Sequence, residues 1–595
     1  MIINNSERNK IFTRRLFILI WVKIFFIFIL IARLFYLQLF KHKKYYTLAD
    51  SNRIKSFLIP PLRGKIIDNN GIILATNSAY YRILLNRTKD LNIEETLTKL
   101  SAILNIPKHN FIYYKSLRKS SKGAILIYDD LNFTQIAQIE ANAPELPGIY
   151  IEPAQRRFYP YNSITSNFIG YVAAVNEREK NQSNNALLAH PDFKIGKIGL
   201  EQIHEQLLRG KAGISHIEVD AHGYVKRTTL PELSQNMEPG KDLKISINID
   251  LQAYIANLTK EQRCSVVLMN VHNGLINAMT STPSFDPNLF LSGIDNSAWQ
   301  NLINNPAKPL VNKAVSSQYP PGSTFKIAVA LAALEDGFNP EQKINCKGKI
   351  KLGRRWFHCW KEEGHGQINL PEAIAQSCNC YFYKMGHEVG IDKISNMAYE
   401  LGLGAKTSNN FYNEKTGNIP TKKWKKQRFN ENWMLGDTYN SSIGQGYVEV
   451  TNIQLAVMMA RIITAKKITP AITSDNKQHF TELNFKAKHI ALILKSMFKV
   501  VNDKTGTAYY SRLSNNDYHL CGKTGTAQVI AIDHNKQEED VAFNKQNHGL
   551  FLGFAPYHQP KYAISIIVEH GKSGSASAAP IAKKIFKFML KKNLA

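Results

Sequence analysis

A serine and a lysine three residues apart are the first candidates for chemistry in this chain. Ser323 follows a Pro-Pro-Gly stretch, and Lys326 precedes an apolar run at 327–334 that predicts a buried helix. Residues at i and i+3 share a helical face, so the amine lies beside the hydroxyl. A part-desolvated lysine there can lose its proton and activate the serine. The alternative is a helix-capping serine beside a solvated lysine, and S-x-x-K alone does not separate the two.

Two further short elements follow downstream. The S-x-N element consists of Ser377, Cys378 and Asn379. The K-T-G-T element consists of Lys523, Thr524, Gly525 and Thr526. Three such elements in this order are far less probable by chance than S-x-x-K alone, and the order is that of the penicilloyl serine transferases.

The K-T-G-T tetrapeptide occurs twice, at 504–507 and at 523–526. The first copy follows an amphipathic run at 490–501 that predicts a helix, so Lys504 would begin a loop. The second copy lies between 518–521 and 527–532, which both predict strand. An extended peptide can pair with an edge strand. We therefore expect Lys523, and not Lys504, to line the site.

Other motifs extend the pattern beyond these elements. They are R-G-x-I-x-D with G-x-x-L-A at 63–75, R-F-Y-P at 157–160, G-L-E at 199–201, G-D-T at 436–438 and I-G-Q-G at 443–446. With them the chain resembles the class B penicillin-binding proteins, and most of all their elongation-specific transpeptidases. It departs from the family at Asn69, where arginine is common. The resemblance is weakest between about 80 and 148.

The resemblance implies a serine-type D,D-transpeptidase that cross-links peptidoglycan stem peptides during cell elongation. Ser323 would attack the penultimate D-alanine of a stem, with Lys326 as base. Ser377 would relay a proton and Asn379 would orient the substrate amide. The K-T-G-T element would hold the terminal carboxylate of the stem. A β-lactam would acylate the same serine.

Two alternatives stay open from the sequence. The same chemistry can end on water, as in a D,D-carboxypeptidase or a β-lactamase, and the fold can also serve as a β-lactam sensor or a silent scaffold. An anchor and a long segment before the catalytic region favour the transpeptidase. The resemblance further implies a SEDS-family glycosyltransferase and other elongation-complex proteins as partners.

An apolar stretch at 16–40 is long enough to cross a bilayer and predicts a single transmembrane anchor. It runs into four basic or histidine residues at 41–44 without a small-residue cleavage site, so we do not expect a cleaved signal peptide. Basic residues flank the stretch on both sides, so the positive-inside rule favours a cytoplasmic tail at 1–15 only slightly. The resemblance places the catalytic domain in the periplasm, tethered to the inner membrane.

Strand patterns, then helices, then strands again predict an α+β fold with an antiparallel sheet flanked by helices. Predicted strands include 245–249, 264–269, 275–280, 550–555 and 563–568, and a helix is expected at 580–590. The resemblance implies a mostly β pedestal of the dimerisation type at 41–240, with a head insertion at about 80–150. The transpeptidase domain is then expected at 241–595.

The net charge of +28, from 75 Lys and Arg against 47 Asp and Glu, favours anionic partners such as a membrane surface or an acidic polymer. No zinc-finger, RRM or helix-turn-helix pattern accompanies the charge, so we expect no nucleic acid. The alternative is a compositional bias, because lysines are scattered among many asparagines and isoleucines.

Four of the six cysteines lie within 35 residues. We predict a structural Cys₃His zinc site made of Cys346, Cys359, His365 and Cys378. The segment 347–366 has little apolar material of its own, so a metal would fix it. Rival interpretations are a Cys346–Cys359 disulfide and free thiols, and His358 or Cys380 can replace a proposed ligand. No organic cofactor is expected.

Overall fold

The computed structural model describes residues 5–85, 92–111, 125–182, 185–190, 193–219, 225–227, 234–291, 293–473, 479–515, 517–529 and 542–594. The chain forms two compact units. The first contains Met1–Pro61, Asn184–His190 and Gly210–Pro239. The second contains Leu62–Ser183, Pro191–Arg209 and Gly240–Ala595, and it holds every residue of the predicted site.

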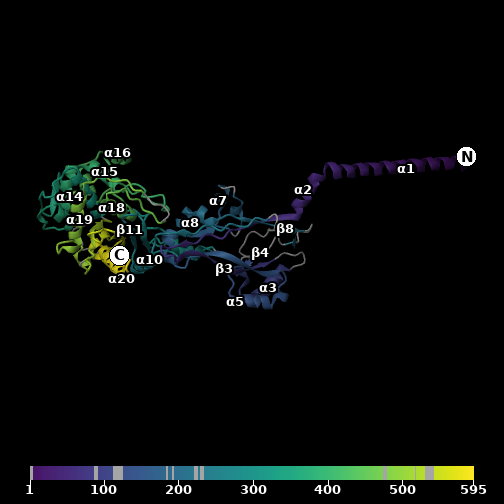
Figure 1. Ribbon diagram of the computed structural model, residues 1–595, viewed down its shortest axis with the longest axis horizontal. Coiled ribbons are helices and arrows are strands. Elements are labelled where there is room, and N and C mark those ends of the chain that lie inside the picture. The colour runs from purple at the N-terminus through teal and green to yellow at the C-terminus, as the bar shows by residue number, and fades with distance from the viewer. Residues whose placement is uncertain are drawn as a thin grey trace. The chain divides into compact units, whose positions relative to one another are not determined.

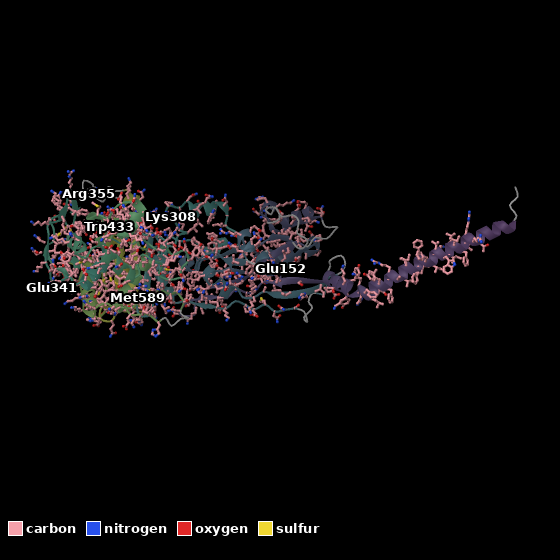
Figure 2. The ribbon with its side chains drawn as sticks, turned by 90° about the horizontal axis from the view of Figure 1, so that it is seen from above. Glu152, Lys308, Glu341, Arg355, Trp433 and Met589 are labelled. Atoms are coloured by element: carbon pink, nitrogen blue, oxygen red, sulfur yellow. The ribbon has the colours of Figure 1, made fainter. Side chains whose placement is uncertain are left out.

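The first unit begins with a long apolar helix. Helix α1 (Asn5–Phe35) continues through a π-helical turn, η1 (Tyr36–Phe40), and is followed by α2 (His42–Arg53). Thr13–Phe40 is long and apolar enough to cross a membrane, with a mean hydropathy of 2.6 over its best window. Its large apolar side chains are exposed, as a lipid-facing helix requires (Figure 2). It is the one such helix within the described ranges.

A small antiparallel sheet completes the first unit. Its strands run in the order β1 (Ile54–Ile59), β8 (Gly213–Val219) and β9 (Val225–Arg227). Ile54 pairs with Glu218 and Ile59 with Gly213, so β1 and β8 pair over their whole common length.

The second unit opens with a five-stranded sheet. The order is β10 (Leu243–Lys244), β2 (Ile66–Ile67), β3 (Ile73–Leu85) and β4 (Ile125–Tyr128), and β5 (Ile149–Phe158) also pairs with β3. The R-G-x-I-x-D and G-x-x-L-A motifs form β2 and the start of β3, on either side of an Asn-Asn-Gly turn. Asp68 closes this turn, because its carboxylate accepts hydrogen bonds from the N–H groups of Asn70 and Ile72 at 2.8 and 2.7 Å.

A separate small core lies between two helices and the strands β3 and β4. Helices α3 (Ile93–Leu104) and α5 (Phe133–Ala141) pack beside β3 and β4, as Figure 1 shows. Asn92 and Asn132 cap the two helices through their side chains. The buried residues of this core are Ile83, Leu85, Leu97, Leu100, Leu104, Phe111, Ile127, Leu131, Ile139 and Leu146. This core lies within the range expected for the head insertion.

Three of the sequence motifs meet at one buried carboxylate. Glu201 accepts hydrogen bonds from Arg63 at 2.6 Å and from Arg157 at 2.7 Å, and Tyr159 donates to it at 3.2 Å. Because Glu201 and Arg157 are almost fully buried, the pairing keeps their charges compensated. These motifs therefore have a structural role. Short elements surround them: α6 (Ser166–Ile169), β6 (Val172–Ala174), α7 (Glu177–Asn181), β7 (Lys194–Gly196), α8 (Gly199–Ile203) and α9 (Glu205–Arg209).

The rest of the second unit is built on a five-stranded antiparallel sheet. Its order is β12 (Ile276–Thr282), β11 (Cys264–Asn270), β19 (Tyr562–Val568), β18 (His548–Ala555) and β17 (Cys521–Ala527). Strand β17 therefore lies at an edge. The strands predicted at 264–269, 275–280, 550–555 and 563–568 are all confirmed.

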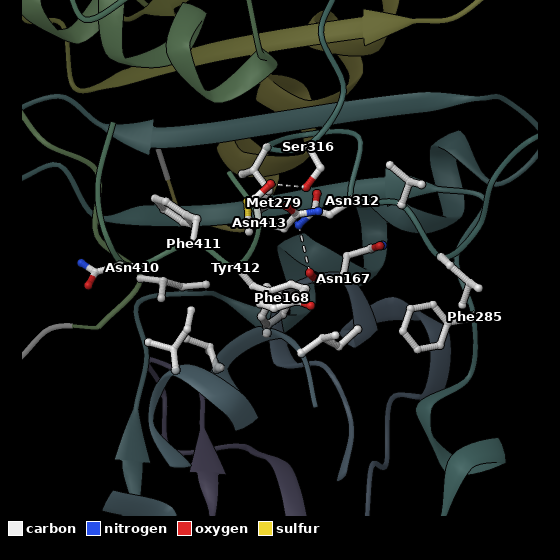
Figure 3. A pocket seen from close by; sticks show the side chains of 18 residues that line it. Asn167, Phe168, Met279, Phe285, Asn312, Ser316, Asn410, Phe411, Tyr412 and Asn413 are labelled. Atoms are coloured by element: carbon white, nitrogen blue, oxygen red, sulfur yellow. Dashed lines mark hydrogen bonds between the residues drawn. The ribbon is translucent and has the colours of Figure 1, made fainter. Parts of the chain in front are cut away.

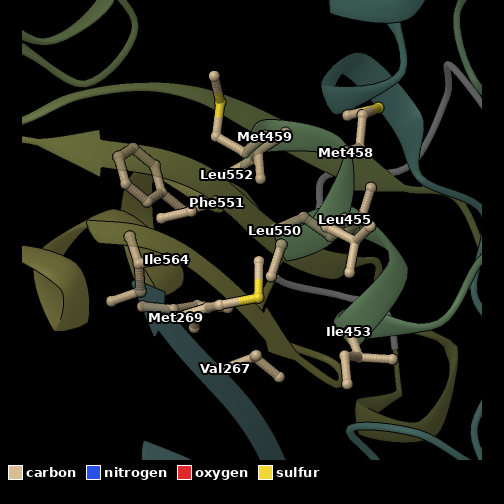
Figure 4. Close-up of a cluster of buried hydrophobic side chains, with 14 of the residues drawn as sticks. Val267, Met269, Ile453, Leu455, Met458, Met459, Leu550, Phe551, Leu552 and Ile564 are labelled. Carbon is tan, nitrogen blue, oxygen red and sulfur yellow. The ribbon is translucent and has the colours of Figure 1, made fainter. Parts of the chain in front are cut away.

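Helix α18 (Asn452–Thr464) packs on one face of this sheet. Ile453, Leu455, Met458 and Met459 lie against Val267, Met269, Leu550 and Leu552, as Figure 4 shows. The side chain of Asn452 also bonds the buried hydroxyl of Ser565 on β19 at 2.5 Å. Helices α10 (Ile249–Thr259) and α20 (Ala579–Lys591) pack on the sheet too, and Tyr254 and Phe588 stack between them at 4.0 Å. The predicted closing helix is α20.

Helices α12 (Lys326–Glu335) and α14 (Asn379–Val389), among the remaining helices of the second unit, contain site residues. The others are α11 (Asn296–Ile303), α13 (Leu370–Ala375), α15 (Ile391–Glu400), α16 (Lys422–Phe429), α17 (Leu435–Ser442) and α19 (Ala487–Asn502). Two small hairpin-like pairs lie between α12 and α13: β13 (Ile344–Cys346) with β16 (Gly366–Ile368), and β14 (Lys349–Leu352) with β15 (Arg355–His358).

Two sequence expectations are wrong in part. A strand is predicted at 245–249, but β10 ends at Lys244 and Ile245 makes only an isolated bridge to Thr473. The N–H groups of Ser246 and Asn248 donate to Ile472 and Asn277, which lie in different segments, so no partner strand continues the pairing. Strand was also expected at 518–521, yet β17 begins only at Cys521. On its other side β17 ends at Ala527, and 530–532 lie outside the described residues.

Candidate active site

Ser323 lies in a tight turn that is held against the edge strand. The turn, η7 (Gly322–Thr324), directly precedes α12. Gly322 has a φ of 53°, and a Cβ there would lie 2.4 Å from the carbonyl oxygen of Thr526 on β17. Its N–H donates to the carbonyl of Gly444 at 2.9 Å. Only glycine allows this approach, so Gly322 brings the serine beside the K-T-G-T strand.

Lys326 joins the first two sequence elements. Its side chain is fully buried, and its Nζ donates to Asn379 Oδ1 at 2.7 Å and to the carbonyl of Ser377 at 2.9 Å. The hydroxyl of Ser377 lies 3.4 Å away. Burial, which is the largest cause, lowers the pKa of Lys326 to about 8. A substantial fraction of this amine is therefore neutral near physiological pH, as a base requires.

The S-x-N element forms a sharp corner between α13 and α14. Ser377 has a φ of 56°, an uncommon conformation for a residue with a side chain, and Asn379 begins α14. The Asn379 side chain donates to the carbonyl of His358 at 3.2 Å, and its backbone N–H points to Cys359 Sγ at 3.3 Å. The segment 346–366 thus contacts the element directly.

The second K-T-G-T copy occupies β17, as predicted. Lys523 is fully buried, and burial lowers its pKa well below the ordinary value, with Lys326 as a further cause. A bound carboxylate would favour the charged form again. A Cβ on Gly525 would lie 3.0 Å from Thr324, so this strand and the serine turn are in close contact. The carbonyl of Thr526 also accepts a hydrogen bond from Gln445 at 2.9 Å.

The first K-T-G-T copy has a role that the sequence did not reveal. Lys504 and Thr505 are exposed in the turn after α19, which confirms that this copy begins a loop. Thr507, however, turns inward: its hydroxyl lies 2.6 Å from the hydroxyl of Thr524, and its N–H donates to the carbonyl of Ala375 at 3.3 Å. The duplication was the only signal in the sequence that this residue matters.

The proposed metal ligands come together. One ligand atom from each of Cys346, Cys359, His365 and Cys378 lies within 4.8 Å of all the others. His365 presents Nδ1 to the sulfurs of Cys346 and Cys359 at 3.6 Å each. Neither His358 nor Cys380 belongs to this group. All six cysteines are buried free thiols in this structure.

Two separations within the cluster fit a tetrahedral metal. With Zn–N near 2.0–2.1 Å and Zn–S near 2.3 Å, tetrahedral angles put nitrogen and sulfur about 3.5 Å apart. The observed 3.6 Å separations agree with this value. Three soft sulfurs and one imidazole are also the donor set that Zn²⁺ prefers.

A cavity of about 130 Å³ lies elsewhere in the second unit (Figure 3). Its walls include Asn167, Phe168, Asn312, Ser316 and Asn413. Asn312 donates to the carbonyl of Asn167, and Ser316 donates to that of Asn413, both at 2.9 Å. None of the predicted site residues lines it, so we do not assign it to catalysis.

Comparison with known proteins decides the family. Residues 264–587 match the penicillin binding protein transpeptidase domain, and residues 58–245 match the penicillin-binding protein dimerisation domain. The chain belongs to the penicillin-binding protein family. The predicted resemblance to its class B members is confirmed, and so is the predicted two-domain α+β fold.

Two relatives of this penicillin-binding protein are named for the same activity. The peptidoglycan D,D-transpeptidase MrdA of Acinetobacter baumannii is 33% identical over 606 residues, which cover 98% of this chain and 88% of the relative. The protein of the same name from Escherichia coli K12 is 33% identical over 92% of this chain and 89% of its own. These names confirm the predicted serine-type D,D-transpeptidase activity.

Solved structures agree. The penicillin-binding protein PBP2 of Helicobacter pylori, in a complex with MreC, has a TM-score of 0.80 and 30% identity, and covers 91% of this chain and all of its own. PBP2 of Pseudomonas aeruginosa, in complex with WCK 5153, has a TM-score of 0.66 and 27% identity, and covers 89% of this chain and 97% of its own.

Proposed function

We propose that this penicillin-binding protein cross-links stem peptides with Ser323 as nucleophile and Lys326 as base. The observation that carries the proposal is the buried amine of Lys326, which bonds Asn379 and Ser377 one helical turn after Ser323. A buried lysine with a lowered pKa next to a serine is an arrangement that activates the hydroxyl. No acidic group is needed for this step.

In the acylation step, Ser323 Oγ bonds to the carbonyl carbon of the penultimate D-alanine and transfers its proton to Lys326. The peptide C–N bond then breaks. The departing amine of the terminal D-alanine takes a proton that passes through the Ser377 hydroxyl, 3.4 Å from Lys326 Nζ. The backbone N–H groups of Ser323 and Thr526 hold the oxyanion, and each such donor is typically worth about 3 kcal/mol. An amine of a second stem then attacks the ester carbonyl carbon, the bond from that carbon to Ser323 Oγ breaks, and a proton lost by the amine returns to the serine oxygen.

The terminal carboxylate of the stem binds at the K-T-G-T strand. Lys523 supplies positive charge there, and the hydroxyls of Thr524 and Thr526 supply hydrogen bonds. Asn379 orients the amide next to the scissile bond, since its side chain is fixed by Lys326 on one side and by the His358 carbonyl on the other. A β-lactam occupies the same site as a mimic of D-Ala-D-Ala and leaves a stable acyl-enzyme.

Labelling with a fluorescent penicillin, followed by peptide mapping of the adduct, tests the proposal. The adduct is expected on Ser323, and Ser323→Ala is expected to abolish labelling in a protein that still unfolds cooperatively. Ser316→Ala is the matched control, because its hydroxyl bonds Asn413 away from the three elements. An adduct on Ser377, or labelling that survives in Ser323→Ala, would refute the assignment.

We also propose one structural zinc at Cys346, Cys359, His365 and Cys378. The metal would tie 346–365 to the S-x-N corner, since Cys378 lies between Ser377 and Asn379. Cys359 also accepts the N–H of Asn379. Zinc would thus position the proton relay without touching substrate. We propose no organic cofactor.

Metal analysis of the purified protein tests the zinc site. About one zinc per chain is expected, and Cys359→Ser is expected to lose it together with fast penicillin acylation. Cys264→Ser is the control, because Cys264 is a buried free thiol outside the cluster. Metal-free protein that acylates at full rate would refute the site.

The finer features of location and partners are proposals too. We propose a cytoplasmic tail at 1–15, an anchor at 16–40, a pedestal at 41–240 and a periplasmic transpeptidase domain at 241–595. We infer an elongation role with a SEDS-family glycosyltransferase. Two likenesses support it: a PBP2 solved with MreC, and a similar chain from a peptidoglycan synthase complex that couples polymerisation with cross-linking. Protease added to intact spheroplasts is expected to digest the transpeptidase domain. Protection of this domain until lysis would show that it lies on the cytoplasmic side instead.

A further inference from the structure

Basic residues are concentrated in the hairpin formed by β14 and β15. The whole chain has 75 Lys and Arg in 595 residues, which is about one in eight. Residues 347–361 have six in fifteen, and neither Asp nor Glu lies among them. The general composition of the chain therefore does not account for this segment.

The pairing of the two strands puts much of this charge on one face. Lys351 pairs with Trp356, and Lys349 pairs with His358, so these side chains share a face of the hairpin. The ammonium groups of Lys349 and Lys351 lie 4.9 and 5.6 Å from the centre of the Trp356 ring. Trp356 is nonetheless 49% exposed. The result is an outward surface of cations around an aromatic ring.

The opposite face of the hairpin is anchored in the protein. The Phe357 ring packs edge-on against Tyr439 and Tyr383, at 5.0 and 5.6 Å. This packing fixes the orientation of the hairpin, so its charged face is held toward solvent. Figure 2 shows Arg355 at the same end of the second unit as Trp433, which precedes α17.

The four outer cations of the hairpin lack acidic partners. In the part of the chain that the structure describes, Lys349, Lys351, Arg354 and Arg355 form no ion pair, and all four are exposed. Four like charges at exposed positions of one short hairpin repel each other. An anionic ligand would relieve this repulsion.

The hairpin also ends at the catalytic residues. The carbonyl of His358, the last residue of β15, accepts hydrogen bonds from Asn379 at 3.2 Å and from the Tyr383 hydroxyl at 3.1 Å. A polymer whose stem peptide lies along the S-x-N element has its neighbouring parts near this hairpin.

We propose that the exposed face and the turn of hairpin β14–β15 dock carboxylate-bearing strands of peptidoglycan. The surface consists of Lys349, Lys351 and Trp356 on that face, and of the exposed Arg354 and Arg355 at the turn end of the hairpin. Arginine binds carboxylates in a bidentate manner, and the apolar face of a sugar ring can lie on the indole. The inference rests on the proposed function, because it assumes that Ser323 takes stem peptides. Contact with the S-x-N element favours a wall strand over a lipid surface.

A sedimentation assay with insoluble peptidoglycan tests this surface. Full-length protein in detergent is spun with native peptidoglycan, and with peptidoglycan whose carboxylates have been converted to amides. The variant K349Q/K351Q/R354Q/R355Q is expected to bind native material about tenfold more weakly, as four exposed ion pairs of modest strength would give. It should bind like wild type on the amidated material. Raised salt should weaken wild-type binding toward the variant's level.

The matched control removes the same charge from another exposed surface, on and just after α20: K584Q/K587Q/K591Q/K592Q. It is expected to bind like wild type. Equal losses in both variants would mean that net charge alone drives binding, and would overturn the proposal, as would full binding by the hairpin variant. If the hairpin variant loses binding to anionic lipid vesicles but keeps its binding to peptidoglycan, the ligand of this surface is a membrane and the proposal is overturned.

Penicillin acylation is measured on the same samples. Acylation within about twofold of wild type in the hairpin variant shows that any lost binding concerns docking. Wild-type protein that fails to acylate would instead refute the proposed function. If the fourfold variant fails to fold, the double variant R354Q/R355Q repeats the test at the turn of the hairpin. A folded double variant that binds peptidoglycan as well as the wild type would overturn the proposal.

Discussion

The hydroxyl of Thr507 is expected to support the substrate-binding strand. It lies 2.6 Å from the hydroxyl of Thr524, which is 7% exposed. Thr507→Val keeps the shape of the side chain and leaves the Thr524 hydroxyl without this partner. A neutral hydrogen bond of this kind has a net worth of about 0.5–1.5 kcal/mol. If Thr524 contacts the carboxylate in the transition state, acylation should slow by about twofold to twelvefold.

Stopped-flow measurement of the second-order acylation rate with a fluorescent penicillin checks this expectation. Thr507→Ser keeps the hydroxyl and should restore most of the rate, which a purely structural role for the methyl group would not allow. Thr505→Val is the matched control, since that hydroxyl bonds Asp503 at 3.0 Å in the exposed turn. A wild-type rate in Thr507→Val, or an equal loss in Thr505→Val, would show that the reasoning is wrong.

Three further predictions concern charge. Because the pKa of Lys326 is lowered to about 8 and the neutral amine is the base, the acylation rate should rise about tenfold from pH 7 to pH 9; a flat profile would contradict it. Lys523→Ala should lose tenfold or more in acylation, about 1.4 kcal/mol, whereas Lys504→Ala should stay within a few-fold, and the reverse result would exchange their roles. Glu201→Gln leaves the buried Arg157 charge uncompensated and should lower the free energy of unfolding by about 3 kcal/mol in urea titration; an unchanged midpoint would argue against this pairing.

Local patterns in the sequence were enough to predict most elements of the candidate site. The Pro-Pro-Gly stretch before Ser323 and the apolar run after Lys326 predicted a turn that leads into a buried helix, and the structure has the turn η7 followed by α12. Strand β17 was recognisable because strand patterns flank Lys523. The four metal ligands were found by residue type and proximity in sequence, although their 3.6 Å contacts depend on folding of the whole segment.

Contacts between distant segments were not predictable in this way. Thr507 and Thr524 are 17 residues apart, and nothing in either tetrapeptide indicates that the end of α19 brings them together. The same holds for the Glu201 cluster, whose partners Arg63 and Arg157 lie 138 and 44 residues away. The strand predicted at 245–249 is absent because the N–H groups of Ile245, Ser246 and Asn248 donate to three different segments, so no single partner strand continues along them, and buried apolar residues alone do not reveal this.

The edge position of β17 also bears on aggregation. An edge strand offers unpaired backbone groups to any extended chain, including one from another copy of the protein. β17 limits this risk, since it has only seven residues, with glycines at 522 and 525 that weaken pairing with unrelated strands. The same glycines weaken the pairing of β17 with a substrate backbone, so the surrounding side chains must supply the selectivity for the substrate. A ligand that covers the edge, such as a penicillin adduct, should therefore keep the protein soluble during heating, beyond any effect on its catalysis.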